Sequence, residues 1–209
     1  MARKLAILEP AVVFALILAY IWELRAVNRN WFMAILVLML LSHWLHRETA
    51  ASLGFGLRNL RDCVRELAPA LTLLTLVLLA GGILLRTVRQ IGSERAALAL
   101  LAYLPWGLAQ QYALNGYFLN RLDAFLPRRA APLAAAAAFA CAHAPNWFLM
   151  SAALLFGYFS ARIYRRRRNL YFLGMAHAAV GFLLFLVVPD SVSHHLKVGP
   201  AWFNSPPPR

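Results

Sequence analysis

Two histidines lie inside strongly apolar stretches of the chain, and both could take part in proton-transfer chemistry. His143 follows a run of small residues in FACAHAPNW, and His177 lies in the apolar segment GMAHAAVGF. With an unperturbed pKa of about 6.5, an imidazole can act as a general base, a hydrogen-bond donor or a metal ligand. Ionisable side chains are rare within membrane segments, so this pair indicates a functional site. A structural histidine with satisfied hydrogen bonds is the alternative for each.

A group of amide side chains occupies the second half of the apolar stretch Leu98–Leu122. It consists of Gln110, Gln111, Asn115 and Asn120. Residues four apart share a helix face, so Gln111 and Asn115 should project in the same direction. Unpaired amides are costly in hydrocarbon and should face other helices or a wet cavity. They either join helices through hydrogen bonds or form one polar site with the two histidines.

The elements that position these residues are expected to be membrane helices. Of the 209 residues, 62% are hydrophobic and 14% are charged, and the mean hydropathy is +0.62. A soluble domain of this length could not bury so much apolar surface. We therefore predict an all-α, polytopic membrane bundle of about seven transmembrane helices. The apolar segments are Leu5–Leu24, Trp31–Leu45, Leu67–Leu85, Ala96–Leu122, Pro132–Ala144, Trp147–Tyr164 and Leu170–Val188.

The order of these segments predicts three parts of the chain. Residues 1–49 should form an N-terminal transmembrane hairpin, residues 50–188 a membrane core, and residues 189–209 a C-terminal tail. The tail ends in SPPPR, which we expect to be disordered because proline can continue neither helix nor strand. Before the third segment, Gly54 and Gly56 permit a turn, and RNLRDCVRE suits a short helix along the membrane interface. Gly107 and Gly116 should let a second helix approach the amide group closely.

The net charge of +13 is better explained by membrane orientation than by nucleic acid binding. The basic residues cluster at the ends of apolar runs, where orientation signals lie. With the N-terminus in the cytoplasm and seven crossings, the 21 Lys and Arg divide into 14 on the cytoplasmic side and 7 outside. We therefore expect an integral protein of a bacterial plasma membrane, with its C-terminus outside and no nucleic acid partner. Arg165–Arg168 is the strongest orientation signal, and contact with anionic lipid is its alternative role.

This layout resembles the CAAX protease and bacteriocin-processing family of intramembrane endopeptidases, which includes the type II CAAX prenyl proteases. The resemblance covers about residues 50–188. Three motifs carry it, in the family's order and at similar spacing. Where the family has Glu-Glu followed by Arg-Gly, this chain has Gln110-Gln111 followed by Asn115-Gly116; the other two motifs are Phe139 to His143, with Asn146 after it, and His177 to Gly181.

The resemblance implies an active site in which a glutamate and a histidine activate water and later residues stabilise an oxyanion. Carried over by position, it implies catalytic roles for His143, His177, Gln110 and Gln111 and binding roles for Asn115 and Asn146. His143 would be the base and His177 the oxyanion stabiliser. A glutamine cannot accept a proton near neutral pH, so Gln110 could only orient water. None of the eight acidic residues lies inside the last four predicted segments to replace the glutamates.

A metal cofactor stays undecided at this point. Zinc or another divalent ion could bind His143 and His177, but catalytic zinc usually has three protein ligands, and amide oxygens are poor substitutes. The set of ligands is therefore incomplete.

Three hypotheses about function follow. The first is an intramembrane, metalloendopeptidase-like protease that cuts membrane-associated or lipidated proteins, slowly because of the two glutamines. The second is a non-catalytic relative that binds membrane helices or lipidated tails in the same cavity. The third is a small transporter or an assembly subunit whose polar groups line a path. Membrane lipids are expected partners in each case.

Overall fold

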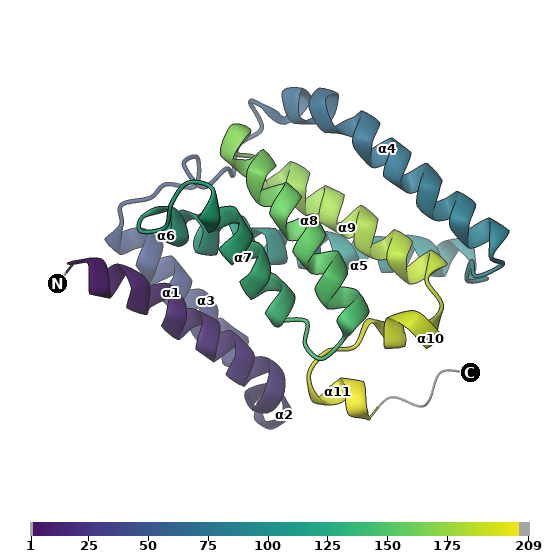
Figure 1. The fold of residues 1–209 in the computed structure, drawn as a ribbon, viewed down its shortest axis with the longest axis horizontal. Coiled ribbons are helices and arrows are strands. Elements are labelled where there is room, and N and C mark those ends of the chain that lie inside the picture. The colour runs from purple at the N-terminus through teal and green to yellow at the C-terminus, as the bar shows by residue number, and fades with distance from the viewer. Residues whose placement is uncertain (1, 205–209) are drawn as a thin grey trace.

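The computed structural model describes residues 2–204, with side chains from residue 7 onward. Within this range the chain forms helices joined by loops, without a β-strand (Figure 1). The prediction of an all-α protein is therefore confirmed.

Four of the predicted segments form helices long and apolar enough to cross a membrane. The first is the continuous run of α1 (Ala2–Ala19), the π-helical turn η1 (Tyr20–Leu24) and α2 (Arg25–Val27). The other three are α4 (Leu60–Leu84), α8 (Trp147–Arg166) and α9 (Leu170–Val187). Two further apolar helices, α3 (Trp31–Leu45) and α7 (Ala130–Cys141), are shorter. The predicted count of seven spans is thus supported for four helices by length and composition.

The amide group lies on a helix that changes its geometry in the middle. α5 (Ser93–Gln111) continues into the π-helix η2 (Tyr112–Leu119) and then into α6 (Asn120–Asp123). Extended π-helical geometry is rare and occurs frequently at functional sites. Here it begins directly after Gln111, so the polar side chains flank a change in helix winding.

α5 and α9 cross in direct backbone contact. A Cβ atom added to Gly107 would lie 2.6 Å from the carbonyl oxygen of Gly174, and one added to Gly174 would lie 2.8 Å from the Cα atom of Leu108. The close approach predicted at Gly107 is therefore confirmed. One turn beyond this crossing, the end of α5 carries Gln111 and the middle of α9 carries His177, so the crossing brings the two side chains together.

The short interfacial helix predicted before the third segment is not a separate element. Its residues form the first turns of α4, which continues as one helix of 25 residues. The thiol-bearing side chain of Cys63 is 1% exposed, so this end of the helix packs on protein. The predicted turn is present, since Gly54 has a φ of 88°. Asn169 holds the loop by donating hydrogen bonds to Gly56 O at 3.0 Å and to Asn59 Oδ1 at 2.8 Å.

The N-terminal helices are joined to the rest of the molecule by a buried arginine. Arg121 on α6 is 5% exposed. Its guanidinium donates to Glu9 Oε1 on α1 at 2.8 Å and to Glu48 Oε2, just after α3, at 2.6 Å. The sequence analysis counts Arg121 among the orientation signals at the membrane surface. In the structure its charge is paired inside the protein, with the carboxylates of Glu9 and Glu48.

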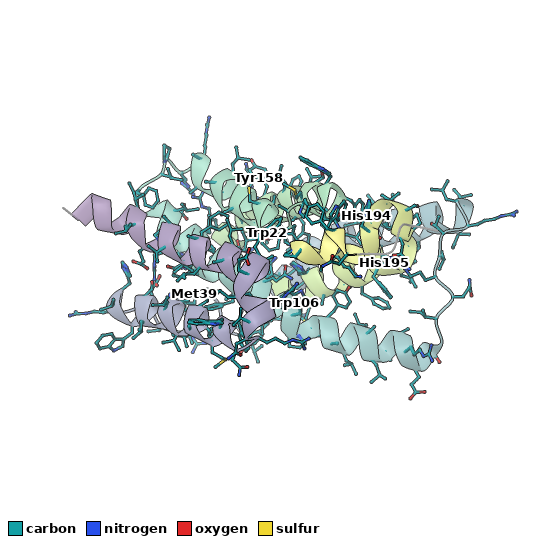
Figure 2. The ribbon with its side chains drawn as sticks, turned by 90° about the horizontal axis from the view of Figure 1, so that it is seen from below. Trp22, Met39, Trp106, Tyr158, His194 and His195 are labelled. Atoms are coloured by element: carbon teal, nitrogen blue, oxygen red, sulfur yellow. The ribbon has the colours of Figure 1, made fainter. Side chains whose placement is uncertain are left out.

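The C-terminal segment folds back onto the molecule. It contains α10 (Asp190–Ser193), a 3-10 turn over His194–Leu196 and α11 (Pro200–Phe203). Gly199 N donates to the carbonyl oxygen of Ala144 at 2.8 Å. Figure 2 shows His194 and His195 beside the N-terminal helices near Trp22, whose ring lies 6.5 Å from that of Phe203. The five final residues, SPPPR, predicted to be disordered, lie outside the described residues.

An ion pair between Arg89, in the loop after α4, and Asp190, the first residue of α10, makes the stability of the fold depend on pH. Arg89 contacts both carboxylate oxygens of Asp190, at 2.9 and 2.5 Å. Hydrogen bonds from this guanidinium hold the pKa of the Asp190 carboxyl below its usual range. A lowered pKa stabilises the folded state above the usual value of about 3.9, and this contribution is lost as the pH falls through the lower, folded value.

We therefore expect Asp190→Asn to lower stability by about 1 kcal/mol at pH 7, because the pair is partly exposed. The difference from wild type should shrink below about pH 4, where the unfolded chain takes up the proton. Thermal unfolding of both proteins in detergent between pH 3 and 7 measures this difference in stability. A difference that does not change with pH would contradict the ion pair as its source.

Candidate functional site

His143 lies in the turn that follows α7. Its Nδ1 is 2.7 Å from the carbonyl oxygen of Phe139. A carbonyl oxygen can only accept, so Nδ1 carries a proton and donates it. In the neutral ring Nε2 is then the acceptor, which is the state that a general base needs.

His177 has the opposite arrangement. Its Nδ1 is 3.0 Å from the side-chain nitrogen of Gln111. The amide nitrogen can only donate, so Nδ1 accepts and the proton of the neutral ring lies on Nε2. This assignment follows from the hydrogen-bond network around Gln111. His177 therefore has a donor on the side of its ring away from Gln111.

The two rings line one small cavity of about 60 Å³. Phe139 contacts both of them edge-on, with ring centroids 4.8 Å from His143 and 5.9 Å from His177. A water occupies about 30 Å³ in the liquid, so the cavity has room for at least one. Its other lining residues are apolar: Leu149, Ala152, Ala153, Phe156, Val180 and Gly181. The ring of His143, whose free nitrogen is an acceptor, and the ring of His177, whose free nitrogen is a donor, thus line the same cavity.

Gln111 is held by a buried network that also includes Ser160 on α8. The Oε1 of Gln111 accepts from Asn115 Nδ2 at 2.7 Å and from Ser160 Oγ at 3.0 Å. Gln111 and Asn115 are fully buried, and they share a helix face as predicted. With its oxygen held by two donors, the amide of Gln111 is fixed with its nitrogen toward His177. The Oδ1 of Asn115 is buried without a hydrogen-bond partner in the described part of the chain.

Gln110 lies on the other side of His143. Both residues line a second cavity of about 190 Å³, which is formed with α1 and also reaches Arg25. The Oε1 of Gln110 is buried without a partner among residues 7–204. The four predicted catalytic residues therefore do not share one cavity. His143 borders both cavities, His177 lines the first, Gln110 lines the second, and Gln111 is bonded to His177.

Asn146 is occupied by structural hydrogen bonds. Its Oδ1 accepts from Leu149 N at 3.1 Å and caps the start of α8. Its Nδ2 donates to the carbonyl oxygens of Ser193 at 2.8 Å and Lys197 at 3.0 Å. Asn146 therefore joins the start of α8 to the C-terminal segment, and it does not line the cavity of the histidines.

The residues of the site do not fit a catalytic zinc ion. His143 and His177 are two imidazoles, whereas such sites usually have three protein ligands. Within the part of the chain that the structure describes, no group of three His, Cys, Asp or Glu side chains is placed to hold a metal. The Nδ1 atoms of both histidines also have other partners. No step is therefore assigned to a metal.

The sequence analysis missed Ser160, which supplies one of the two donors to Gln111. The available signal was a hydroxyl within the apolar helix α8, close to the small residues Gly157 and Ala161. Such combinations are typical of contacts between membrane helices. A hydroxyl in this setting more often joins helices than supports a site, so the sequence did not distinguish Ser160 from an ordinary packing residue.

A long apolar groove continues from the histidine cavity toward the outside of the molecule. It has a volume of about 540 Å³ and lies between α4, α8 and α9. In Figure 1, α4 lies at one edge of the molecule, alongside α9. Ala152, Phe156 and Val180 line both the groove and the histidine cavity. A chain lying in the groove would therefore end close to the two imidazoles.

Comparison with known proteins agrees with this arrangement. Residues 92–183 match the family model for "Type II CAAX prenyl endopeptidase Rce1-like". They include the whole of α5, the π-helix η2, α6, α7, α8 and the part of α9 that carries His177. No curated protein and no solved structure matches the chain. Together with four helices long and apolar enough to cross a membrane, the match indicates an integral membrane protein, and residues 92–183 are similar to the Rce1-like type II CAAX prenyl endopeptidases.

Proposed function

We propose that this protein is a membrane-embedded endopeptidase that cuts membrane-associated or lipidated proteins. The observation that carries the proposal is the opposite hydrogen bonding of the two histidines. His143 has its Nδ1 bonded as a donor, and His177 has its Nδ1 bonded as an acceptor. One ring is thereby prepared to accept a proton and the other to donate a hydrogen bond. Peptide hydrolysis needs both functions.

In the proposed reaction, Nε2 of His143 takes a proton from a water in the shared cavity. The resulting hydroxide attacks the carbonyl carbon of the peptide bond. Nε2–H of His177 donates a hydrogen bond to the oxyanion that forms on the carbonyl oxygen. The protonated His143 then gives its proton to the leaving nitrogen, and the C–N bond breaks. Gln111 keeps His177 in the required tautomer. Gln110 lines the second cavity, on which His143 also borders, and takes no part in this step.

The reaction should be slow, because no carboxylate assists the imidazoles. A positioned acid–base group typically contributes about 10²–10⁴ to the rate. Gln110 and Gln111 stand where the family has glutamates, and a glutamine cannot take a proton near neutral pH. The proposal is therefore a weak protease.

The apolar groove supports a substrate with a membrane-embedded part. Its walls are almost entirely aliphatic and aromatic side chains of α4, α8 and α9. A prenyl or acyl chain, or an apolar peptide segment, could lie there and place an attached peptide near His143 and His177. We further propose that all seven apolar segments lie in the membrane, with the N-terminus in the cytoplasm. The excess of arginine in the loops assigned to that side supports this orientation.

The decisive experiment restores the two glutamates. Gln110→Glu with Gln111→Glu is expected to raise proteolysis of a lipidated reporter peptide in liposomes by about tenfold or more. The surroundings of Gln111 suit a carboxylate, because Asn115 and Ser160 already donate to its oxygen. A carboxylate at position 111 would favour the protonated His177 ring, whose Nδ1–H donates to that carboxylate while its Nε2–H stays available to the oxyanion.

Gln90→Glu is the matched control. This glutamine is exposed in the loop between α4 and α5, so the same chemical change there should leave the rate unchanged. If both wild type and the double variant bind the lipidated reporter and neither cuts it, the protein is a non-catalytic binder and the proposal fails. If the protein instead moves a solute in response to a proton gradient, it is a transporter.

A further inference from the structure

The C-terminal end of α8 and the turn after it carry five arginines with very different surroundings. Three of them have partners within the protein. Arg165 pairs with Asp123, Arg167 pairs with Glu66 at 3.2 Å, and Arg168 donates to the carbonyl oxygen of Ser52 at 2.7 Å. Most of the arginine run noted in the sequence therefore serves to hold loops together.

The other two arginines lie one turn apart and have no acidic partner among the described residues. Arg162 donates to the hydroxyl of Tyr158 at 3.1 Å and lies over its ring. Arg166 has no hydrogen bond or ion pair within residues 7–204. Both line a surface pocket of about 330 Å³, whose floor includes Phe159. Tyr158 marks this face of α8 in Figure 2.

This basic pocket is continuous with the apolar groove between α4, α8 and α9. Phe159 and Ile163 line both of them. From Ile163 the groove follows α8 back to Ala152, which is about 17 Å along a helix that rises 1.5 Å per residue. One leaflet of a bilayer has a hydrocarbon thickness of about 15 Å. The groove therefore has the length of a lipid chain in one leaflet, with two cations at its polar end.

We propose that this is a binding site for an anionic membrane phospholipid. Its phosphate lies between Arg162 and Arg166, and one acyl chain lies in the groove. Guanidinium groups bind phosphate oxygens through paired hydrogen bonds and are less strongly hydrated than ammonium groups. Two unpaired positive charges favour a headgroup with a net negative charge over a zwitterionic one. Its acyl chain would lie in the same groove that is proposed above for the lipid of a substrate, but neither arginine lines the histidine cavity, so the test below measures lipid binding and not proteolysis.

The test measures lipid retention by native mass spectrometry of the full chain, delipidated in detergent. Phosphatidylglycerol is compared with phosphatidylcholine of the same chains. Wild type is expected to bind phosphatidylglycerol more tightly. R162Q with R166Q should lower that affinity about 30-fold, to the level of phosphatidylcholine, since each basic residue contributes about 1 kcal/mol at an anionic surface. R162K with R166K keeps both charges and should retain most of the binding.

Arg61 and Arg65 provide the matched control. They are also exposed and one turn apart on a helix, and they line neither the pocket nor the groove. R61Q with R65Q removes the same charge and should change the affinity by less than about twofold. Ala70→Trp narrows the groove from α4 and should also weaken binding of phosphatidylglycerol.

Each remaining outcome overturns the proposal. If R61Q with R65Q weakens binding as much as R162Q with R166Q, the effect is general surface charge. If glycerol phosphate at millimolar concentration displaces the lipid and Ala70→Trp has no effect, the site binds the phosphate alone. If phosphatidylcholine is retained as strongly as phosphatidylglycerol in wild type, headgroup charge has no role.

Discussion

Replacing His143 with alanine is expected to lower proteolysis by about 10²–10⁴-fold, because the variant loses the only proposed general base. Cleavage of a lipidated reporter peptide in liposomes, measured under single-turnover conditions, gives the rate. His177→Ala should lower the rate by about 10²–10³-fold, which is typical for loss of one oxyanion donor. Binding of the uncut reporter should be nearly unchanged in both variants, since the apolar groove that would hold its lipid lies mainly on α4, α8 and α9.

His195→Ala is the control for these two variants. His195 lies in the C-terminal segment, where it pairs with Asp190 at 3.1 Å and does not line the cavity. Its removal should leave the rate within about twofold of wild type, because partly exposed pairs contribute little. A full rate in His143→Ala would exclude this residue as the base. Loss of reporter binding in His143→Ala would instead indicate that the ring has a structural role in the cavity.

The second large effect is expected for Arg121→Met, which should lower the free energy of unfolding by about 3 kcal/mol. The change leaves the carboxylates of Glu9 and Glu48 without their shared partner, and unpaired charges in a partly buried place are strongly unfavourable. Ser42 and His43 on α3 would also lose contacts with the guanidinium. Unfolding of purified protein in mixed micelles with increasing denaturing detergent measures the change.

The triple variant Arg121→Met, Glu9→Gln, Glu48→Gln separates charge from packing. Without the two carboxylates, most of the lost stability should return, because no buried charge is left unpaired. A triple variant as unstable as Arg121→Met would show that the shape of the arginine matters more than its charge. Residual proteolysis per folded molecule should be similar in all of them, since Arg121 lines neither the histidine cavity nor the groove.

The positions of the helices could be predicted from the sequence, because they depend on local patterns. The predicted segment Trp31–Leu45 coincides with α3, and Leu170–Val188 ends one residue after α9. Each apolar run ends at charged, proline or glycine residues that local chemistry makes unfavourable in a membrane helix. The start of α4 was placed incorrectly, because its first turns are polar on one side and pack on protein through Cys63. Local composition cannot distinguish such a packed end from an interfacial helix.

The sequence could not predict in the same way that Gln110 and Gln111 would face different parts of the structure. Gln110 and Gln111 are neighbours in the chain, so they point about 100° apart on a helix and face different cavities. Which of them meets a histidine depends on how α5 crosses α9 at Gly107 and Gly174. Similarly, the sequence alone does not distinguish Arg121 from a surface arginine. Its burial depends on the packing of α1 and of the residues after α3, which place Glu9 and Glu48 against its guanidinium.

The sequence by itself determined that this chain is an all-helical membrane protein, which residues could do chemistry, and which family it resembles. These properties follow from hydropathy, residue type and spacing along the chain, and each can be evaluated one segment at a time. Only the tertiary structure showed that His143 and His177 are hydrogen-bonded in opposite ways, that Ser160 holds Gln111, and that the basic pocket adjoins the apolar groove. Each depends on two or more helices that are distant in the sequence, and their contacts depend on side-chain packing in three dimensions.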